Sequence, residues 1–272
     1  MTAVTEPIFP NVVETGAGPP VVLLHSGAGE ARDWRRFTTE LGGEFRCSAP
    51  DLYGSGRTPP WPGPDALSID DQVELVETLV KRIGAPVHVV GHSYGGAIAL
   101  RLAVMRPYLV RTVSLIEPQC YLLLRELADP QFEVSWSLWN NVRGLFEGGE
   151  AESGWRQFID YFSGVGFWDR LRPEIRASFL SASPIERWAV LFANPTTVAA
   201  LRQLRVPALV LCGETTTPPE RRMCEVIAEA MPHAALETIR GAGHMSPITH
   251  PKEVAMRIAI NISGNAALRS SQ

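Results

Sequence analysis

The chain of 272 residues carries a formal net charge of −4, and its 25 basic and 29 acidic side chains are dispersed along the sequence. This balance excludes the basic surface of a nucleic-acid-binding protein. A content of 45% hydrophobic and 20% charged residues excludes an intrinsically disordered chain, and the length fits one large α/β domain or two small ones.

Short apolar strands alternate with helical patterns along most of the chain. The sequence predicts strands at 20–25, 46–50, 87–91, 112–117, 207–213 and 235–240, and helices at 69–83, 94–105, 220–231 and 252–262. The last segment, 263–272, is small and polar, and we expect a frayed tail there. The alternation is typical of an α/β fold with a mostly parallel central sheet and helices on both faces.

One segment interrupts this alternation, between about residue 119 and residue 195. It shows no strand pattern, and it holds five of the seven tryptophans together with seven phenylalanines. We expect an inserted helical lid (cap) subdomain at 119–195 on a core formed by 1–118 and 196–272. Most of the aromatic side chains would form the core of the lid, and a minority would face a substrate cavity.

The cysteines, the first residues and the length of the apolar stretches indicate where in the cell the protein is found. The cysteines lie far apart without metal-binding spacing, so we expect buried, reduced thiols and no metal site at Cys47, Cys120, Cys212 and Cys224. The first residues lack the basic and apolar regions of a secretory leader. No apolar stretch approaches the length of a membrane span, about 20 residues. These features predict a cytoplasmic protein without a membrane partner.

A G-x-S-x-G pattern at 91–95 follows the apolar run 87–90 and precedes a helical pattern. Between a strand and a helix, this pattern is typical of a nucleophile elbow, whose sharp turn holds the serine hydroxyl above the sheet. Glycines suit the turn because neighbouring elements pack closely against it. Ser93 is therefore the candidate nucleophile, and the N–H of Tyr94 is a candidate donor to a developing oxyanion.

A serine nucleophile needs a base and a second oxyanion donor. The candidate base is His244, in a G-A-G-H pattern after the last predicted strand, where it can reach over the strand ends. The second donor is the N–H of Gly27, in the glycine-rich loop 24–30, where a side chain would hold the substrate away. We expect His25 to support this loop, and we expect no catalytic part for His92 at the variable position of the elbow.

The glycine-rich loop also allows a rival interpretation. G-A-G-E-A-R at 27–32 follows a strand like a dinucleotide-binding motif, and Asp51 ends the next strand. Arg32, however, occupies the place of the third glycine. A dinucleotide-binding oxidoreductase would also leave the serine turn and His244 unexplained, so we expect Asp51 to be structural and the site to need no cofactor.

Four motifs occur in chain order: H-S-G at 25–27, D-L-Y-G-S-G-R at 51–57, G-H-S-Y-G-G at 91–96 and G-A-G-H at 241–244. With them the chain resembles α/β-hydrolase-fold enzymes of the lidded esterase, lactonase and C–C hydrolase kind over essentially its whole length. The resemblance implies an α/β-hydrolase fold and cofactor-free serine chemistry. These motifs are not specific for a substrate.

The chain departs from this family at the triad acid. The usual aspartate follows the penultimate strand, and here Thr216 occupies its position, although threonine cannot offset the charge of an imidazolium. Two carboxylates are candidates instead. Glu117 ends the strand that neighbours the nucleophile strand in this topology, and Glu214 lies two positions before Thr216.

A distant likeness favours Glu117. The fungal zearalenone-lactone hydrolases are similar in a Gly-x-Gly-Glu oxyanion loop, in a strand-end glutamate followed by proline-containing sequence, and in a Thr-Pro-rich segment where the usual aspartate is missing. This likeness implies Glu117 as the acid and a lactone or ester as the substrate.

The predicted activity is cleavage of a carboxylic ester or lactone of an apolar small molecule through an acyl-enzyme on Ser93. Glu117 and His244 would complete the triad, and Gly27 and Tyr94 would form the oxyanion hole. Two alternatives stay open. One is a cofactor-independent C–C hydrolase or oxygenase on the same fold, and the other is a ligand-binding protein with a decayed triad, which Thr216 motivates.

Overall fold

The computed structural model describes residues 8–84, 86–182 and 184–270. Seven strands form one sheet in the order β1-β3-β2-β4-β5-β6-β7, in which every neighbouring pair is parallel except β1 and β3. The strands are β1 (Val12–Thr15), β2 (Pro20–Leu24), β3 (Arg46–Pro50), β4 (Val87–His92), β5 (Val110–Ile116), β6 (Ala208–Gly213) and β7 (Ala234–Ile239). The predicted mostly parallel sheet is confirmed. The stretch 1–7, for which we predict no secretory leader, lies outside the described residues.

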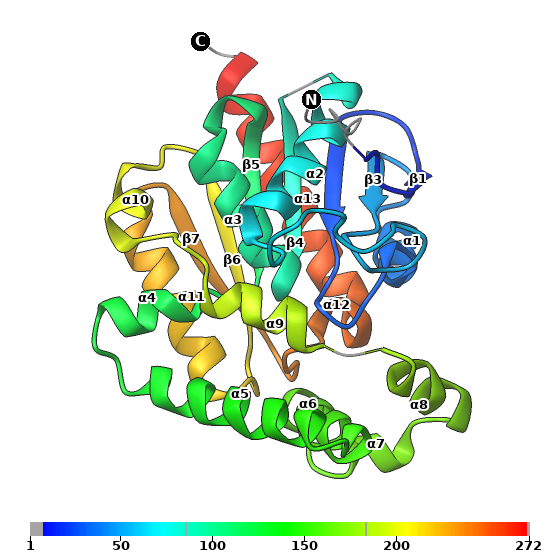
Figure 1. The fold of residues 1–272 in the computed structure, drawn as a ribbon. Coiled ribbons are helices and arrows are strands. Elements are labelled where there is room, and N and C mark those ends of the chain that lie inside the picture. The colour runs from blue at the N-terminus through cyan, green and yellow to red at the C-terminus, as the bar shows by residue number, and fades with distance from the viewer. Residues whose placement is uncertain (1–7, 85, 183, 271–272) are drawn as a thin grey trace, which may run out of the picture.

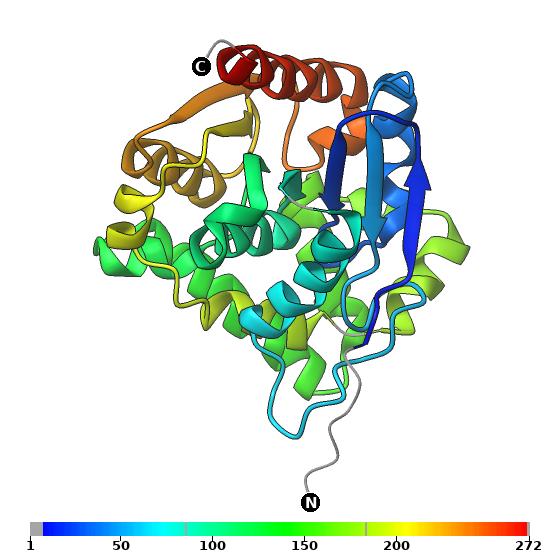
Figure 2. The ribbon, with the colours of Figure 1, turned by 90° about the horizontal axis from the view of Figure 1, so that it is seen from above.

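Helices cover both faces of this sheet (Figures 1 and 2). One face carries α2 (Ile69–Ile83), α3 (Tyr94–Met105) and α11 (Pro218–Ala230), and the other carries α1 (Arg35–Glu40) and α13 (Pro251–Ser270). Successive strand residues point to opposite faces. Val22 and Leu24 therefore pack into the core under α2, α3 and α11, and Val21 and Leu23 pack into the core under α1 and α13.

Local sequence explains where α2 begins and ends. The Ser68 hydroxyl oxygen accepts a hydrogen bond from the Asp71 N–H at 3.2 Å, and the Asp71 carboxylate accepts the Ser68 N–H in return. This reciprocal cap satisfies N–H groups that have no partner within the helix. Gly84 ends the helix in the left-handed conformation.

The first strand and the C-terminal segment differ from the prediction. We missed β1 because Val12–Thr15 is an edge strand that is mostly exposed and shows no alternation of apolar residues. The expected frayed tail is wrong over 263–270, since α13 continues to Ser270, and residues 271–272 lie outside the described residues. Alanines in this stretch favour the helix even without an apolar face. No helix in the described ranges is long and apolar enough to span a bilayer.

A run of helices separates β5 from β6. They are α4 (Tyr121–Glu126), α5 (Gln131–Glu147), α6 (Ala151–Ser163), α7 (Phe167–Arg170), α8 (Pro173–Leu180), α9 (Ile185–Phe192) and α10 (Val198–Gln203). Figure 1 shows α5 to α8 together beyond one end of the sheet, with α9 between them and the core. Trp155, Ile159 and Trp168 form a separate small core within these helices.

Candidate active site

The turn between β4 and α3 is tightly constrained. Ser93 has φ of 57° and ψ of −116°, a combination that costs free energy and is common at functional sites. A Cβ on Gly91 would lie 2.3 Å from the carbonyl oxygen of Gly95, and a Cβ on Gly95 would lie 2.3 Å from that of Leu24. Only glycine fits at either position, as the pattern predicted, and the turn holds Ser93 at the end of the central strand.

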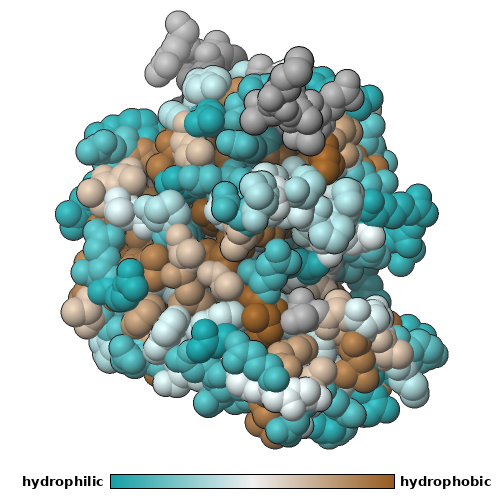
Figure 3. All heavy atoms as spheres, in the orientation of Figure 1, coloured by the Kyte–Doolittle hydropathy of each residue, from teal (hydrophilic) through white to brown (hydrophobic). Residues whose placement is uncertain are grey.

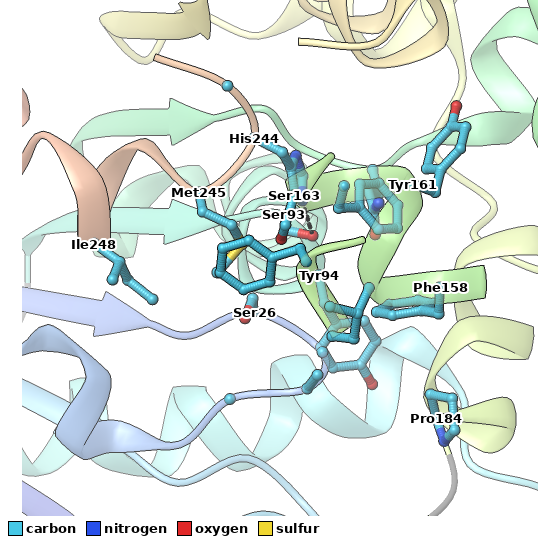
Figure 4. Close-up of a pocket in the computed structure, with 18 of the residues that line it drawn as sticks. Ser26, Ser93, Tyr94, Phe158, Tyr161, Ser163, Pro184, His244, Met245 and Ile248 are labelled. Carbon is cyan, nitrogen blue, oxygen red and sulfur yellow. Dashed lines mark hydrogen bonds between the residues drawn. The ribbon is translucent and has the colours of Figure 1, made fainter. Parts of the chain in front are cut away.

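Three side chains from three separate loops form a hydrogen-bonded chain. His244 Nε2 lies 3.1 Å from Ser93 Oγ, and His244 Nδ1 lies 2.7 Å from Glu117 Oε2. Figure 4 shows Ser93 and His244 pointing toward each other at the cavity. All three residues are buried. Because a carboxylate only accepts hydrogen bonds, Nδ1 carries the proton and Nε2 is free to take one from Ser93.

The Glu117 carboxylate is held by three donors. Its Oε1 accepts the Gly213 N–H at 2.7 Å, and its Oε2 accepts the Thr216 hydroxyl at 2.6 Å in addition to His244. Burial alone raises the pKa of Glu117. The hydrogen bond and charge of His244 lower this pKa, and so do the hydrogen bonds from Thr216 and Gly213. Together they outweigh burial, so the pKa of Glu117 lies below its ordinary value. Glu117 is therefore ionised and oriented.

The structure brings Glu117, and not Glu214, to His244. The Glu214 side chain is exposed, and its Oε2 accepts the N–H of Gly241 at 2.7 Å. Thr216, at the position where the family usually has its acid, instead donates to Glu117. The loop after β6 therefore contributes a hydrogen-bond donor to the carboxylate that meets His244, and that carboxylate follows β5.

The two predicted oxyanion donors lie side by side. A Cβ on Gly27 would lie 3.4 Å from the Cβ of Tyr94, which places the loop after β2 against the start of α3. Within the described chain, neither N–H donates a hydrogen bond to another protein group. Both groups also line the cavity that contains Ser93.

His25 supports the oxyanion loop, as expected. Its Nε2 accepts the Leu52 N–H at 3.1 Å, so Nδ1 carries the proton and donates to the Ser26 carbonyl oxygen at 2.7 Å. The same carbonyl accepts the Gly29 N–H at 3.0 Å. Burial lowers the pKa of His25 to about 4, so the ring is neutral. These bonds hold the peptide unit whose N–H belongs to Gly27.

Asp51 is structural, as the sequence analysis inferred. One carboxylate oxygen accepts the Ala31 N–H at 2.8 Å, and the other accepts the Arg57 N–H at 2.9 Å and the Asn11 amide at 2.8 Å. The carboxylate ties the turn 51–57 to the oxyanion loop. Its oxygens are occupied by these bonds, which argues against the ribose-binding acid of the rival interpretation.

His92 is a functional candidate that the sequence analysis missed. Its Nε2–H donates to the backbone oxygen of His244 at 2.8 Å, and the two rings lie 5.0 Å apart. Burial, reinforced by the charge of His244, lowers the pKa of His92 to about 3. A neutral, buried histidine beside Ser93 therefore braces the loop that carries His244. Its place within the elbow was the only signal in the sequence.

Replacing His92 with phenylalanine should lower kcat about tenfold, because one lost hydrogen bond of about 1–1.5 kcal/mol loosens the His244 loop. A His92→Gln variant should recover most of the loss, since its amide can donate to the same carbonyl. Steady-state kinetics on a chromogenic ester would measure both. Unchanged kcat in His92→Phe would exclude the bracing role.

A second carboxyl lies near the triad. Glu220, at the start of α11, is buried; its Oε2 accepts the Tyr161 hydroxyl at 3.4 Å, and its Oε1 has no protein partner among the described residues. Burial, and then the negative charge of Glu117, raises the pKa of Glu220 from 4.5 to about 8. Nothing in the sequence marks this residue, because a single glutamate on a helix gives no sign of burial.

Glu220 makes stability depend on pH. Between about pH 4.5 and 8 it is protonated in the folded chain and ionised in the unfolded one, so the free energy of unfolding should fall as pH rises, by about 1.4 kcal/mol per pH unit. Glu220→Gln should remove this loss and be more stable than wild type at pH 8. Urea unfolding at pH 5 and 8 would measure it, with Glu229→Gln on the same helix as control. If the free energy of unfolding changed equally with pH in wild type and Glu220→Gln, Glu220 would not be the cause of the pH dependence.

A cavity of about 580 Å³ opens onto Ser93 and His244. Its wall from α6 to α9 is mostly apolar, and Figure 3 shows hydrophobic side chains gathered between the core and these helices. The Phe162 ring lies over His244 with ring centroids 4.5 Å apart. The apolar side chains of this wall include Phe158, Ile159, Phe162, Phe167, Leu171, Phe179, Trp188 and Leu191.

Comparison with known proteins identifies the family of the chain. Residues 21–257 match the alpha/beta hydrolase family. The chain is 40% identical over 118 residues to lipase LipV of Mycobacterium tuberculosis. The matched stretch is 42% of this chain and 44% of the lipase. It is 22% identical to the pimeloyl-acyl-carrier-protein methyl ester esterase of Nitrosomonas europaea, over 89% of this chain and 95% of the esterase.

A solved structure shares the fold. A bromoperoxidase from Bacillus anthracis superimposes with a TM-score of 0.75 at 20% identity, over 93% of this chain and 94% of that one. At this identity the likeness concerns the fold alone.

Proposed function

Because this chain belongs to the alpha/beta hydrolase family, we propose that it cleaves a carboxylic ester or lactone of an apolar small molecule through an acyl-enzyme on Ser93. The observation that carries this proposal is the hydrogen-bonded chain from Glu117 through His244 to Ser93. The similar esterase and lipase support ester chemistry. The apolar cavity supports an apolar substrate.

In the first step, Ser93 Oγ attacks the carbonyl carbon while His244 Nε2 takes its proton. The carbonyl oxygen becomes an oxyanion and accepts the N–H groups of Gly27 and Tyr94. His244 then gives the proton to the leaving alkoxide oxygen, which breaks the ester bond and leaves the acyl group on Ser93.

In the second step, His244 takes a proton from water as the water attacks the acyl carbon. The tetrahedral intermediate collapses, Ser93 regains its proton from His244, and the carboxylic acid leaves. Glu117 keeps the proton on Nδ1 throughout and stabilises the imidazolium that forms in each step.

The helices between β5 and β6 would then act as a lid, with residues 119–195 as the cap and 1–118 and 196–272 as the core. The apolar lining that α6 to α9 add to the cavity supports this division. We also propose a cytoplasmic location, which is supported by the four cysteines, all buried and unpaired.

Intact-protein mass after brief exposure to a fluorophosphonate tests the acyl-enzyme. Wild type should gain one adduct, Ser93→Ala should gain none, and wild type should hydrolyse p-nitrophenyl esters of medium acyl length. A wild-type chain that neither gains an adduct nor turns over esters would contradict the proposal. Tight binding of an apolar ligand by such a chain would favour a binding protein instead.

A further inference from the structure

Arg187, on helix α9, connects the helical segment to two loops of the core. Its Nη1 donates to the carbonyl oxygen of Gly27 at 2.5 Å, and its Nη2 donates to that of Gly54. Gly27 belongs to the oxyanion loop, and Gly54 belongs to the turn 51–57 that Asp51 ties to the same loop. One side chain of α9 therefore holds both loops beside the cavity.

The chemistry of this contact requires a guanidinium. Arg187 is half-buried, it lines the cavity, and no carboxylate of the described chain forms an ion pair with it. Burial lowers its pKa, but a guanidinium stays charged at any pH at which the protein is folded. Its planar fork can bond two carbonyl oxygens at once, which the single ammonium of a lysine cannot do in the same geometry.

The contact bears on the orientation of the Gly27 N–H. On one side of Gly27, the Ser26 carbonyl is held by His25 and Gly29. On the other side, the Gly27 carbonyl is held by Arg187. The Gly27 N–H lies in the peptide unit that contains the Ser26 carbonyl, and Arg187 holds the peptide unit that follows it. Glycine has wide conformational freedom, so holding the units on both sides limits rotation of the loop about Gly27. Oxyanion donors accelerate a reaction only when they are already aimed at the developing charge.

We propose that Arg187 is a positioning residue that completes the oxyanion hole from helix α9. The Gly27 N–H is correctly aimed only while α9 is seated on the core, so lid position and transition-state stabilisation are coupled. This inference rests on the proposed function of the site. It adds that the helical segment, besides forming the cavity wall, sets the geometry of a catalytic donor.

The test compares Arg187→Met and Arg187→Lys with Arg156→Met, a matched change at an arginine of α6 that pairs with Asp169 away from the cavity. Each variant is assayed for kcat and KM on a p-nitrophenyl ester, and for the affinity of a trifluoromethyl ketone, which mimics the tetrahedral intermediate. Thermal unfolding of each variant shows whether it is folded.

Arg187→Met should lower kcat roughly 10²-fold, the scale of losing one oxyanion donor, with KM changed less than about threefold. The affinity for the ketone should fall by the same factor. Arg187→Lys, which keeps the charge and the fold, should recover only a small part. A further variant, Arg187→Ala, should lose activity as Arg187→Met does and regain it with added methylguanidinium. Arg156→Met should behave as wild type.

Wild-type kcat and ketone affinity in folded Arg187→Met would overturn the inference. A rise in KM with unchanged kcat would also overturn it, because Arg187 would then bind substrate rather than position a donor. Fluorophosphonate labelling distinguishes a failure of this inference from a failure of the proposed function. A labelled wild type with equally fast labelling of Arg187→Met defeats only this inference, whereas an unlabelled wild type defeats the proposed function.

Discussion

Replacing Glu117 with glutamine should lower kcat for ester hydrolysis about 10⁴-fold, the loss expected when a triad carboxylate becomes an amide. Glutamine has the same shape, and its amide oxygen would stay where Oε1 accepts the Gly213 N–H. Its NH₂ group would then replace Oε2, and this group accepts neither the Thr216 hydroxyl nor the His244 N–H. His244 would then turn to the tautomer that has its proton on Nε2, which cannot take one from Ser93. Initial rates across pH 6 to 9 would measure the loss.

Two variants of the loop after β6 serve as controls. Glu214→Gln should keep nearly wild-type kcat, because that side chain bonds to the Gly241 N–H and not to His244. Thr216→Val should cost about tenfold, since it removes one donor to Glu117 and leaves the charge in place. A large loss in Glu214→Gln with little loss in Glu117→Gln would instead assign the acid to Glu214.

Replacing Ser93 with alanine should lower kcat about 10⁶-fold, because the nucleophile is lost and only the remaining groups can promote direct attack by water. A Ser93→Ala/His244→Ala double variant should be hardly slower than Ser93→Ala, since the two residues act as a unit. Single-turnover kinetics and acid-quench mass spectrometry should detect an acyl adduct in wild type and none in either variant.

Ser163 provides a matched control for Ser93. It also lines the cavity, as Figure 4 shows, but it lies on α6, and no described hydrogen bond joins it to His244. Ser163→Ala should therefore keep wild-type turnover and labelling. Full ester turnover by Ser93→Ala would rule out the acyl-enzyme and favour direct attack by water. Failure of simple esters to acylate Ser93 in the wild type would instead favour cofactor-independent C–C cleavage or oxygenation at the same cavity.

Features that depend on neighbouring residues could be predicted from the sequence. The glycines around Ser93 fit a turn that only glycine can form, and the periodicity of 69–83 and 94–105 predicted helices that end at the observed residues. The alternation of strands and helices predicted the sheet, because each strand must bury both of its faces under helices. Chain order then placed the nucleophile, the base and the oxyanion loop at one edge.

Which carboxylate meets His244 depends on how the strands are arranged in the folded chain. Glu117 and Glu214 both follow strands, and nothing local distinguishes them; β5 lies between β4 and β6, so its end is within hydrogen-bond distance of the base. The proposed roles of His92 and Arg187 rest on contacts to backbone carbonyls far away in sequence. Carbonyls are common to all residues, so a sequence pattern cannot mark such partners, and folding alone brings them together.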